Sequence, residues 1–227
     1  MRIIIDTDPA MGTLGGDPED SFAIMLALNS PEVTVEGITV VQGNVPAEKG
    51  YSNAHHLLSL LGRQDVPLRR GCLRPMNAQR TTQITFLEQR YATEQITPML
   101  EPKGADADAV SFLIDTVLSC PGEITLVTIG PLTNVATAIQ QAPEFASALK
   151  NIVMMGGTAE CACNIAPAAE FNYSQDPDAA DMVFRCRADL TSVGLDFGHQ
   201  THLYSSQHDE CVTLVTPLGH SVPASSA

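Results

Sequence analysis

Two aspartates, Asp6 and Asp8, follow a short β-branched run at the start of the chain. Acids two positions apart on an extended chain share a face, so both carboxylates can point at one spot. Left alone, the two charges would repel each other, and one carboxylate would be forced to bind a proton. A hard cation removes that conflict, and oxygen-only ligands suit calcium or magnesium. The spacing therefore indicates a metal site at the end of a strand.

A second acidic pair, Glu19 and Asp20, follows directly after Asp17 and Pro18. Asp17 is a favoured helix cap and Pro18 suits a first turn, so the pair is expected on the first turn of a helix. From there the two carboxylates could close the same metal cage. The alternative is that they only complement the helix macrodipole, and these residues by themselves leave both interpretations open.

Apolar strands alternate with amphipathic helices along the chain. Strands are expected at 2–5, 33–41, 123–129, 152–155 and 190–195. Helices are expected to begin at 17, 46, 106, 133 and 176, and the stretch 70–105 stays unassigned. This alternation predicts a single α/β domain over 1–200, with a mostly parallel central sheet flanked by helices, and a short atypical tail over 201–227. In such a sheet the ligand crevice lies at the carboxyl ends of the strands, where Asp6, Asp8 and Asn44 stand.

Composition restricts the classes of partner. A formal net charge of −14 argues against a nucleic-acid surface, because phosphate binding needs clustered Lys and Arg. No apolar run approaches the roughly 18 residues of a membrane span, and the first apolar stretch meets an acid too early for a signal peptide. A cytoplasmic protein with no nucleic-acid or membrane partner is therefore expected, with its six scattered cysteines as reduced thiols. A homo-oligomer stays open.

The order of several motifs resembles the inosine-uridine-preferring nucleoside hydrolase family. The opening Asp6-Thr7-Asp8-Pro9, with an acidic pair behind it, is similar to the first motif of that family. Two further blocks are specific to the family pattern, Gly130-Pro131-Leu132-Thr133-Asn134 and Ala169-Glu170-Phe171-Asn172. The match covers about residues 1–200 and implies a nucleoside hydrolase-like, Rossmann-like fold.

The resemblance also implies an activity, namely calcium-dependent hydrolysis of the N-glycosidic bond of a small-molecule ribonucleoside to ribose and a free nucleobase. By position, Asp8 would ligate Ca²⁺ and act as general base on a bound water. Asp20 would be a second ligand, and the main-chain oxygen of Ile129 a third. Glu19, where the family usually has Asp, would hold the ribose hydroxyls. The ribose site would be completed by Asn44, Asn164, Glu170 and Asn172. Such an anionic pocket suits a transition state with oxocarbenium character.

The chain departs from the family pattern between the two metal-binding acids. Asp8 and Asp20 stand further apart than in most members, and the stretch Gly12–Gly16 looks like an insertion. This insertion would either bulge outward or swing Asp20 away, and Asp17 is then the fallback ligand. Residues 71–100 also lack the His-Gly loop that many members place beside the nucleobase, so the preference for purine or pyrimidine is not readable.

The end of the chain carries another departure. His208-Asp209-x-Cys211 resembles a family block in which the Asp ligates calcium and the His lies beside the base. The resemblance therefore makes His208 a candidate catalytic residue and Asp209 a candidate metal ligand. Only residues 197–207 separate this block from the preceding strand, where the family normally has several helices. The alternative to an active hydrolase is a truncated or degenerate relative that binds nucleoside or calcium without turnover.

A third interpretation is a haloacid-dehalogenase-type phosphatase, with Asp6 as nucleophile and Asp8 as acid. That chemistry needs a later Lys and an acidic pair at strand ends. The central lysines, Lys103 and Lys150, are poorly placed for this role in the expected order of elements.

Overall fold

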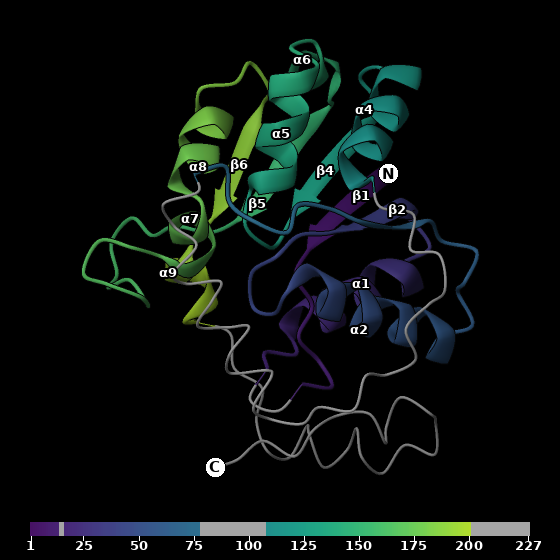
Figure 1. The fold of residues 1–227 in the computed structure, drawn as a ribbon, viewed down its shortest axis with the longest axis horizontal. Coiled ribbons are helices and arrows are strands. Elements are labelled where there is room, and N and C mark those ends of the chain that lie inside the picture. The colour runs from purple at the N-terminus through teal and green to yellow at the C-terminus, as the bar shows by residue number, and fades with distance from the viewer. Residues whose placement is uncertain (14–15, 78–107, 201–227) are drawn as a thin grey trace.

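The structure is a computed structural model, and it describes residues 1–13, 16–77 and 108–200. Within these ranges one six-stranded sheet runs through the molecule, and every neighbouring pair of strands is parallel (Figure 1). In order across the sheet, the strands are β3 (Leu68–Arg70), β2 (Thr34–Val40), β1 (Arg2–Thr7), β4 (Ile124–Thr128), β5 (Asn151–Met155) and β6 (Leu190–Val193). The predicted α/β domain with a parallel central sheet is confirmed.

The strand order reverses at β1, since β2 and β3 extend the sheet on one side and β4, β5 and β6 extend it on the other. Open parallel sheets bind ligands outside the carboxyl ends of the strands at such a reversal. Asp8 follows β1 and Ile129 follows β4. Two of the residues expected to bind a metal therefore stand at the point where the fold favours a ligand.

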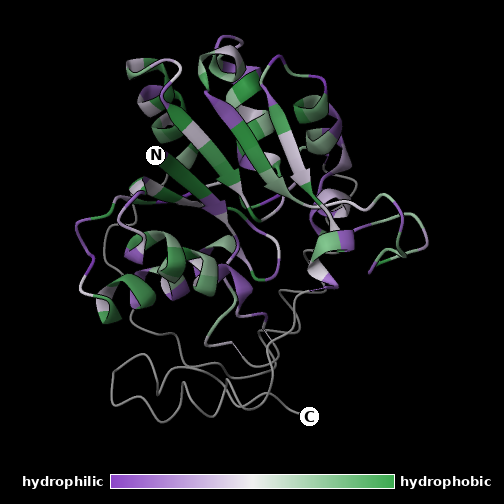
Figure 2. Cartoon of the chain, turned by 180° about the vertical axis from the view of Figure 1, so that it is seen from behind, coloured by the Kyte–Doolittle hydropathy of each residue, from purple (hydrophilic) through white to green (hydrophobic). Residues whose placement is uncertain are grey.

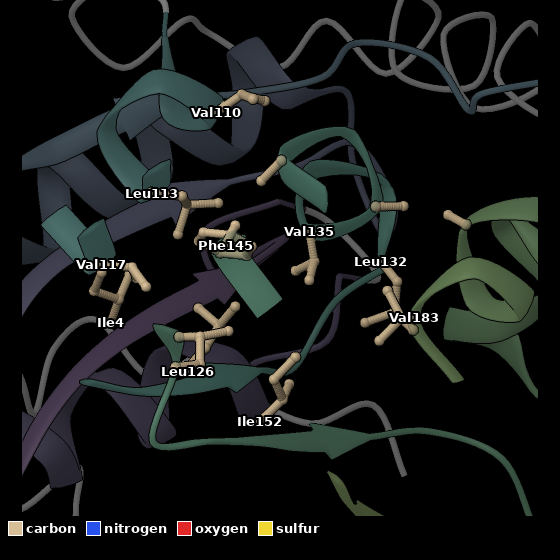
Figure 3. Packing of buried hydrophobic residues seen from close by; sticks show 14 of the residues in the cluster. Ile4, Val110, Leu113, Val117, Leu126, Leu132, Val135, Phe145, Ile152 and Val183 are labelled. Atoms are coloured by element: carbon tan, nitrogen blue, oxygen red, sulfur yellow. The ribbon is translucent and has the colours of Figure 1, made fainter. Parts of the chain in front are cut away.

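Helices pack against both faces of the sheet, but on one of them only over β1, β2 and β3 within the described residues. On one face, α1 (Glu19–Asn29) and α2 (Ala47–Leu60) pack against a core that includes Ile3 and Ile5. On the other face, around Ile4 (Figure 3), lie α4 (Ala109–Ser119), α5 (Thr133–Gln141), α6 (Phe145–Ala148) and α8 (Pro177–Phe184). Successive strand residues point to opposite faces, so burial on both faces explains why three isoleucines follow one another in β1. In the view from behind in Figure 2, no helix of the described residues lies in front of β4, β5 and β6, and the helices of the other face are seen behind these strands.

Two short helices, α7 (Phe171–Gln175) and α9 (Leu195–Gly198), lie near the carboxyl ends of the strands (Figure 1). No helix within the described residues is long and apolar enough to cross a membrane.

The helix starts test the capping predictions. Asp176 caps α8 by accepting a hydrogen bond from the main-chain N of Ala179, with a proline at the first position, as the sequence predicts. Helix α1 begins at Glu19 rather than at Asp17, whose side chain accepts from the Glu19 main-chain N at 3.1 Å. Helix α5 begins at Thr133, as expected, but no side chain caps it, and the Thr133 hydroxyl donates to Asp176 Oδ2 at 2.8 Å.

Several predictions fall outside the described residues. The helix expected from 106 is described from Ala109, after a cap at Asp108, and residue 106 itself is not described. The tail predicted over 201–227 also lies outside the described residues, together with most of the unassigned stretch 70–105.

Candidate functional site

A cavity of about 440 Å³ opens at the carboxyl ends of the central strands. Its polar lining consists of Asp17, Glu19, Asp20, Asn44, Asn164, Glu170 and Asn172. Its apolar lining consists of Ala23, Ile129, Met155 and Phe171. Every candidate that the sequence names between positions 19 and 172 therefore borders the same space. His208 and Asp209 lie outside the described residues.

Asp8 is fully buried behind the wall of this cavity. Its Oδ2 accepts a hydrogen bond of 2.6 Å from the main-chain N of Asn44, whereas its Oδ1 is buried without a hydrogen-bond partner. A buried carboxylate oxygen with no partner is costly, so the arrangement favours a ligand or proton at Oδ1.

Two glycines let the chain close around Asp8. A Cβ atom at Gly43 would lie 2.0 Å from Asp8 Oδ2, and one at Gly130 would lie 2.6 Å from Asp8 Oδ1. Real Cβ atoms do not approach other atoms this closely, so with any larger residue at either position the loop or the carboxylate would have to shift. The Gly residues of the two loops that follow β2 and β4 thus shape a cradle for one side chain.

Asp20 is the second carboxylate of the site. It is almost fully buried, Thr7 Oγ1 donates to its Oδ1 at 2.7 Å, and Asn44 Nδ2 lies 3.5 Å from its Oδ2. The insertion therefore does not swing Asp20 out of the cavity. Asp17, the fallback metal ligand, also borders the cavity, so Asp17 and Asp20 both lie there.

The electrostatics of this pair are unfavourable without a counter-charge. Burial raises the pKa of Asp8 well above its ordinary value, and the charge of Asp20 raises it further. Burial raises the pKa of Asp20 to about 7, with the charges of Asp17 and Glu19 adding to the shift. Partial desolvation and the charge of Asp17 raise the pKa of Glu19, although Glu19 is exposed at the mouth of the cavity. Several carboxylates thus face one space that contains no basic side chain among its described lining residues.

These features fit a hard divalent cation. A cation would satisfy Asp8 Oδ1 and offset the repulsion between Asp8 and Asp20. The two carboxylates offer it oxygen ligands, which hard cations prefer. Within the described residues, however, no three His, Cys, Asp or Glu side chains form a group that could hold a metal ion. Further ligands would have to be main-chain carbonyls such as that of Ile129, amide oxygens or water.

Asp6 occupies a different place from the one that the strand spacing indicates. Its Oδ1 accepts from Thr39 Oγ1 at 2.5 Å and from Asn134 Nδ2 at 2.7 Å, inside the sheet and away from the cavity lining. Burial raises its pKa to about 7. The partner of Asp8 is therefore Asp20, whose charge raises the pKa of Asp8 more than that of Asp6 does. Because Thr39 and Asn134 both donate to Asp6 Oδ1, the structure gives no support to the phosphatase interpretation, which needs Asp6 as a nucleophile.

The residues expected to bind ribose also hold the cavity wall together. Glu170 caps α7: its Oε1 accepts from the Asn172 main-chain N at 2.9 Å, and its Oε2 accepts from Tyr173 at 3.1 Å and Gly157 at 3.0 Å. Asn172 Nδ2 donates to the carbonyl of Ile129 at 3.0 Å and to that of Met155 at 3.1 Å. The wall is thus tied to the ends of β4 and β5.

Asn164 joins the same wall from a loop. Its Oδ1 accepts from the Phe171 main-chain N at 2.9 Å, which fixes the loop to the start of α7. Its side-chain amide borders the cavity. An amide held at one oxygen can still present its nitrogen to a hydroxyl-bearing ligand.

Asn134 ends the Gly130–Asn134 motif, from which no role for it was predicted. It is fully buried, it donates to Asp6, and its Oδ1 accepts from the Cys72 main-chain N at 2.8 Å. It therefore links β1 to the segment that leaves β3. A polar residue on the first turn of a helix directly after a strand is the only local signal for this role.

Comparison with known proteins identifies the relatives of this chain. The family profile described as "Inosine-uridine preferring nucleoside hydrolase" matches residues 3–225. A protein named "Probable uridine nucleosidase 2" from Arabidopsis thaliana is 39% identical over 211 residues, which cover 92% of this chain and 63% of that protein. A protein named "Pyrimidine-specific ribonucleoside hydrolase RihA" from Photobacterium profundum is 35% identical, over 95% of this chain and 67% of that protein.

Solved structures show the same likeness. A plant nucleoside hydrolase, the PpNRh1 enzyme, superposes with a TM-score of 0.81 at 33% identity, covering 97% of this chain and 68% of its own. The purine-preferring ribonucleoside hydrolase from Gardnerella vaginalis gives a TM-score of 0.81 at 32% identity, covering 97% and 69%. The chain thus spans about two thirds of the length of the relatives it matches.

Proposed function

The chain belongs to the inosine-uridine preferring nucleoside hydrolase family, and from this membership we propose that it hydrolyses the N-glycosidic bond of ribonucleosides to ribose and a free nucleobase. The observation that carries the proposal is Asp8, buried behind the cavity with one carboxylate oxygen uncommitted. The relatives include proteins named for uridine, pyrimidine and purine substrates, so the proposal is made for ribonucleosides as a class.

In this proposal Asp8 is the general base. The oxygen of a water forms a bond to the anomeric carbon of ribose while Asp8 accepts the proton of that water. The bond from this carbon to the nucleobase nitrogen breaks, and its electron pair leaves with the base. The base takes up a proton from solvent, and Asp8 later returns its proton to solvent. Positive charge develops on the sugar, and the surrounding acids, Glu19 and Asp20, stabilise it.

The ribose hydroxyls would be bound by Glu19, Asn44, Asn164, Glu170 and Asn172. All five border the cavity, and amide side chains suit hydroxyls because each offers donors and an acceptor. Both carboxylate oxygens of Glu170 accept hydrogen bonds from main-chain N–H groups. We therefore expect the sugar to make a further hydrogen bond to Glu170 while this residue still caps α7.

We further propose calcium as the cation, held by Asp8, Asp20 and the carbonyl of Ile129. When bound, such a cation lowers the pKa of a ligating water. Asp209 as a last ligand and His208 beside the nucleobase stay predictions from the family block. Asp209→Ala tests the first of these by calcium titration, and an affinity equal to that of the unsubstituted chain would remove Asp209 from the site.

Location and assembly rest on the sequence alone. A cytoplasmic location and a homo-oligomeric assembly stay predictions.

The test is a reducing-sugar assay on uridine and inosine with the full 227-residue chain, with and without added calcium. We expect ribose release that needs calcium and that disappears on chelation. Calorimetry against calcium and ribose separates the two main alternatives, because binding without ribose release would support the inactive relative over the enzyme.

A further inference from the structure

The inserted stretch between the two acids has a defined turn structure in its described part. The main-chain N of Thr13 donates to the carbonyl of Ala10 at 3.0 Å, and that of Gly16 donates to the carbonyl of Thr13 at 2.9 Å. Gly12 has a φ of 87°, a left-handed conformation that favours glycine. A Cβ atom at Gly16 would lie 2.5 Å from the Ala10 carbonyl oxygen. The described residues Thr13 and Gly16 therefore lie close to Ala10, shortly after Asp8.

One side chain from outside this stretch holds it. Asn53 Nδ2 donates to the carbonyl of Pro9 at 2.9 Å and to Thr13 Oγ1 at 3.3 Å. Both Asn53 and Thr13 are buried, at 4% and 5% exposure. The amide nitrogen of Asn53 thus joins the residue after Asp8 to the middle of the insertion, while its Oδ1 has no partner.

Helix α2, which carries Asn53, is a rigid support for this contact. Its residues Ala54, Leu57 and Leu58 are buried in the core on this face of the sheet. One turn earlier, Gly50 lets the helix approach β2, because a Cβ atom there would lie 3.0 Å from Val40 Cγ1, and Pro9 Cδ would lie at an ordinary contact distance of 3.6 Å. A loop fastened to such a helix keeps its place relative to β1.

We propose that Asn53 and Thr13 are positioning residues that fix the loop between Asp8 and Asp20, so that the longer loop still brings the two carboxylates together. We call the two hydrogen bonds of Asn53 Nδ2, to the Pro9 carbonyl and to Thr13 Oγ1, the clamp. Without the clamp, the insertion would have freedom to carry Asp20 away from Asp8. The catalytic consequence rests on the proposed function, whereas the clamp itself does not.

The test compares three variants of the full chain. Asn53→Leu keeps the number and branching of the side-chain heavy atoms and removes the donor, and Asn53 Oδ1 has no bond to lose. Thr13→Val is isosteric and removes only the acceptor hydroxyl. Ser59→Ala is the control, because Ser59 is on the same helix and its hydroxyl donates at 2.9 Å to the carbonyl of His55 in that helix. Three quantities are measured: amide hydrogen exchange over residues 9–20, calcium affinity, and ribose release.

We expect exchange over 9–20 to quicken in Asn53→Leu and less in Thr13→Val, with no change in Ser59→Ala. The dissociation constant for calcium should rise about tenfold in Asn53→Leu, which loses two hydrogen bonds. It should rise about threefold in Thr13→Val, which loses one. The kcat of both variants should recover at saturating calcium, since no group that touches substrate has changed. A general structural defect would not be repaired in this way.

Exchange and calcium affinity equal to those of Ser59→Ala in both variants would overturn the clamp. If Asn53→Leu does not fold, Thr13→Val decides by the same two measurements. If the unsubstituted chain binds no calcium, the cation in the proposed function fails, and hydrogen exchange alone decides the clamp.

Discussion

The two carboxylate oxygens of Asp8 differ, because Oδ2 accepts a hydrogen bond from Asn44 and Oδ1 has no partner. This difference predicts the effect of replacing Asp8. Asp8→Asn retains an oxygen that can accept from the Asn44 main-chain N, so the fold should persist. The variant lacks a base and a charge for the cation, so ribose release should fall by at least about 10²–10⁴-fold. The reducing-sugar assay measures the loss, and circular dichroism checks the fold. A variant with most of its activity would show that another group is the base.

Glu170 has two separable roles, a cap on α7 and a proposed ribose contact. Glu170→Gln leaves one acceptor oxygen for the three main-chain N–H groups of Gly157, Asn172 and Tyr173. We expect a loss of about 1–2 kcal/mol in the free energy of unfolding, together with a lower kcat/KM for ribonucleosides.

The matched control for Glu170 is Glu160→Gln, since Glu160 is an exposed acid in the preceding loop. Thermal unfolding and steady-state kinetics of both variants give the comparison. An unchanged kcat/KM in Glu170→Gln would remove this residue from the ribose site and leave only the cap.

At the scale of elements, the alternation of apolar strands and helices was sufficient to predict the parallel sheet and the edge that carries the site. The three-residue strand β3 escaped prediction because Arg69 and Arg70 give it no apolar pattern. The start of α1 was misplaced because Asp17 bonds only to Glu19 and does not cap the helix. Local patterns thus predict most elements and fail where an element is short or its cap is unused.

The contacts that position the site could not be read from the sequence. The bond between Asn134 and Asp6 joins residues 128 positions apart, and the one between Asn53 and Pro9 joins residues 44 apart. Such pairs are set by how the strands and helices pack, which no local spacing encodes. The family motifs named most of the cavity residues, but they did not show that Glu170 and Asn172 also hold its wall.

The loop after β2 makes an element-scale prediction. Gly43→Ala would place a methyl group 2.0 Å from Asp8 Oδ2, so the loop or the carboxylate must shift. We expect a cost of about 1–3 kcal/mol in the free energy of unfolding and a sharp loss of calcium affinity and ribose release. Gly198→Ala, where a Cβ atom meets nothing within 4 Å, is the control. Equal effects of the two substitutions on calcium affinity would contradict the cradle around Asp8.

At the scale of the whole molecule, a chain with a formal net charge of −14 buries Asp6, Asp8 and Asp20 at one end of β1. Burial raises the pKa of Asp6 and of Asp20 to about 7, whereas the ordinary value in an unfolded chain is 3.8. Between these two values the folded protein holds more protons than the unfolded chain. The free energy of unfolding of the cation-free protein must therefore fall as pH rises through this window.

Calcium should weaken that pH dependence, because it replaces the protons that the buried carboxylates would otherwise bind. In the presence of a chelator, we expect the midpoint of thermal unfolding to drop between about pH 5 and about pH 8. With calcium the drop should be smaller, and calcium affinity should rise over the same range as Asp8 and Asp20 ionise. Asp6→Asn removes one titrating group that is not a proposed ligand, so it should flatten the slope in chelator while the gain from calcium remains. A midpoint that rises with pH in chelator would mean that these carboxylates are ionised in the folded protein at low pH, and that their charges are already compensated without a cation.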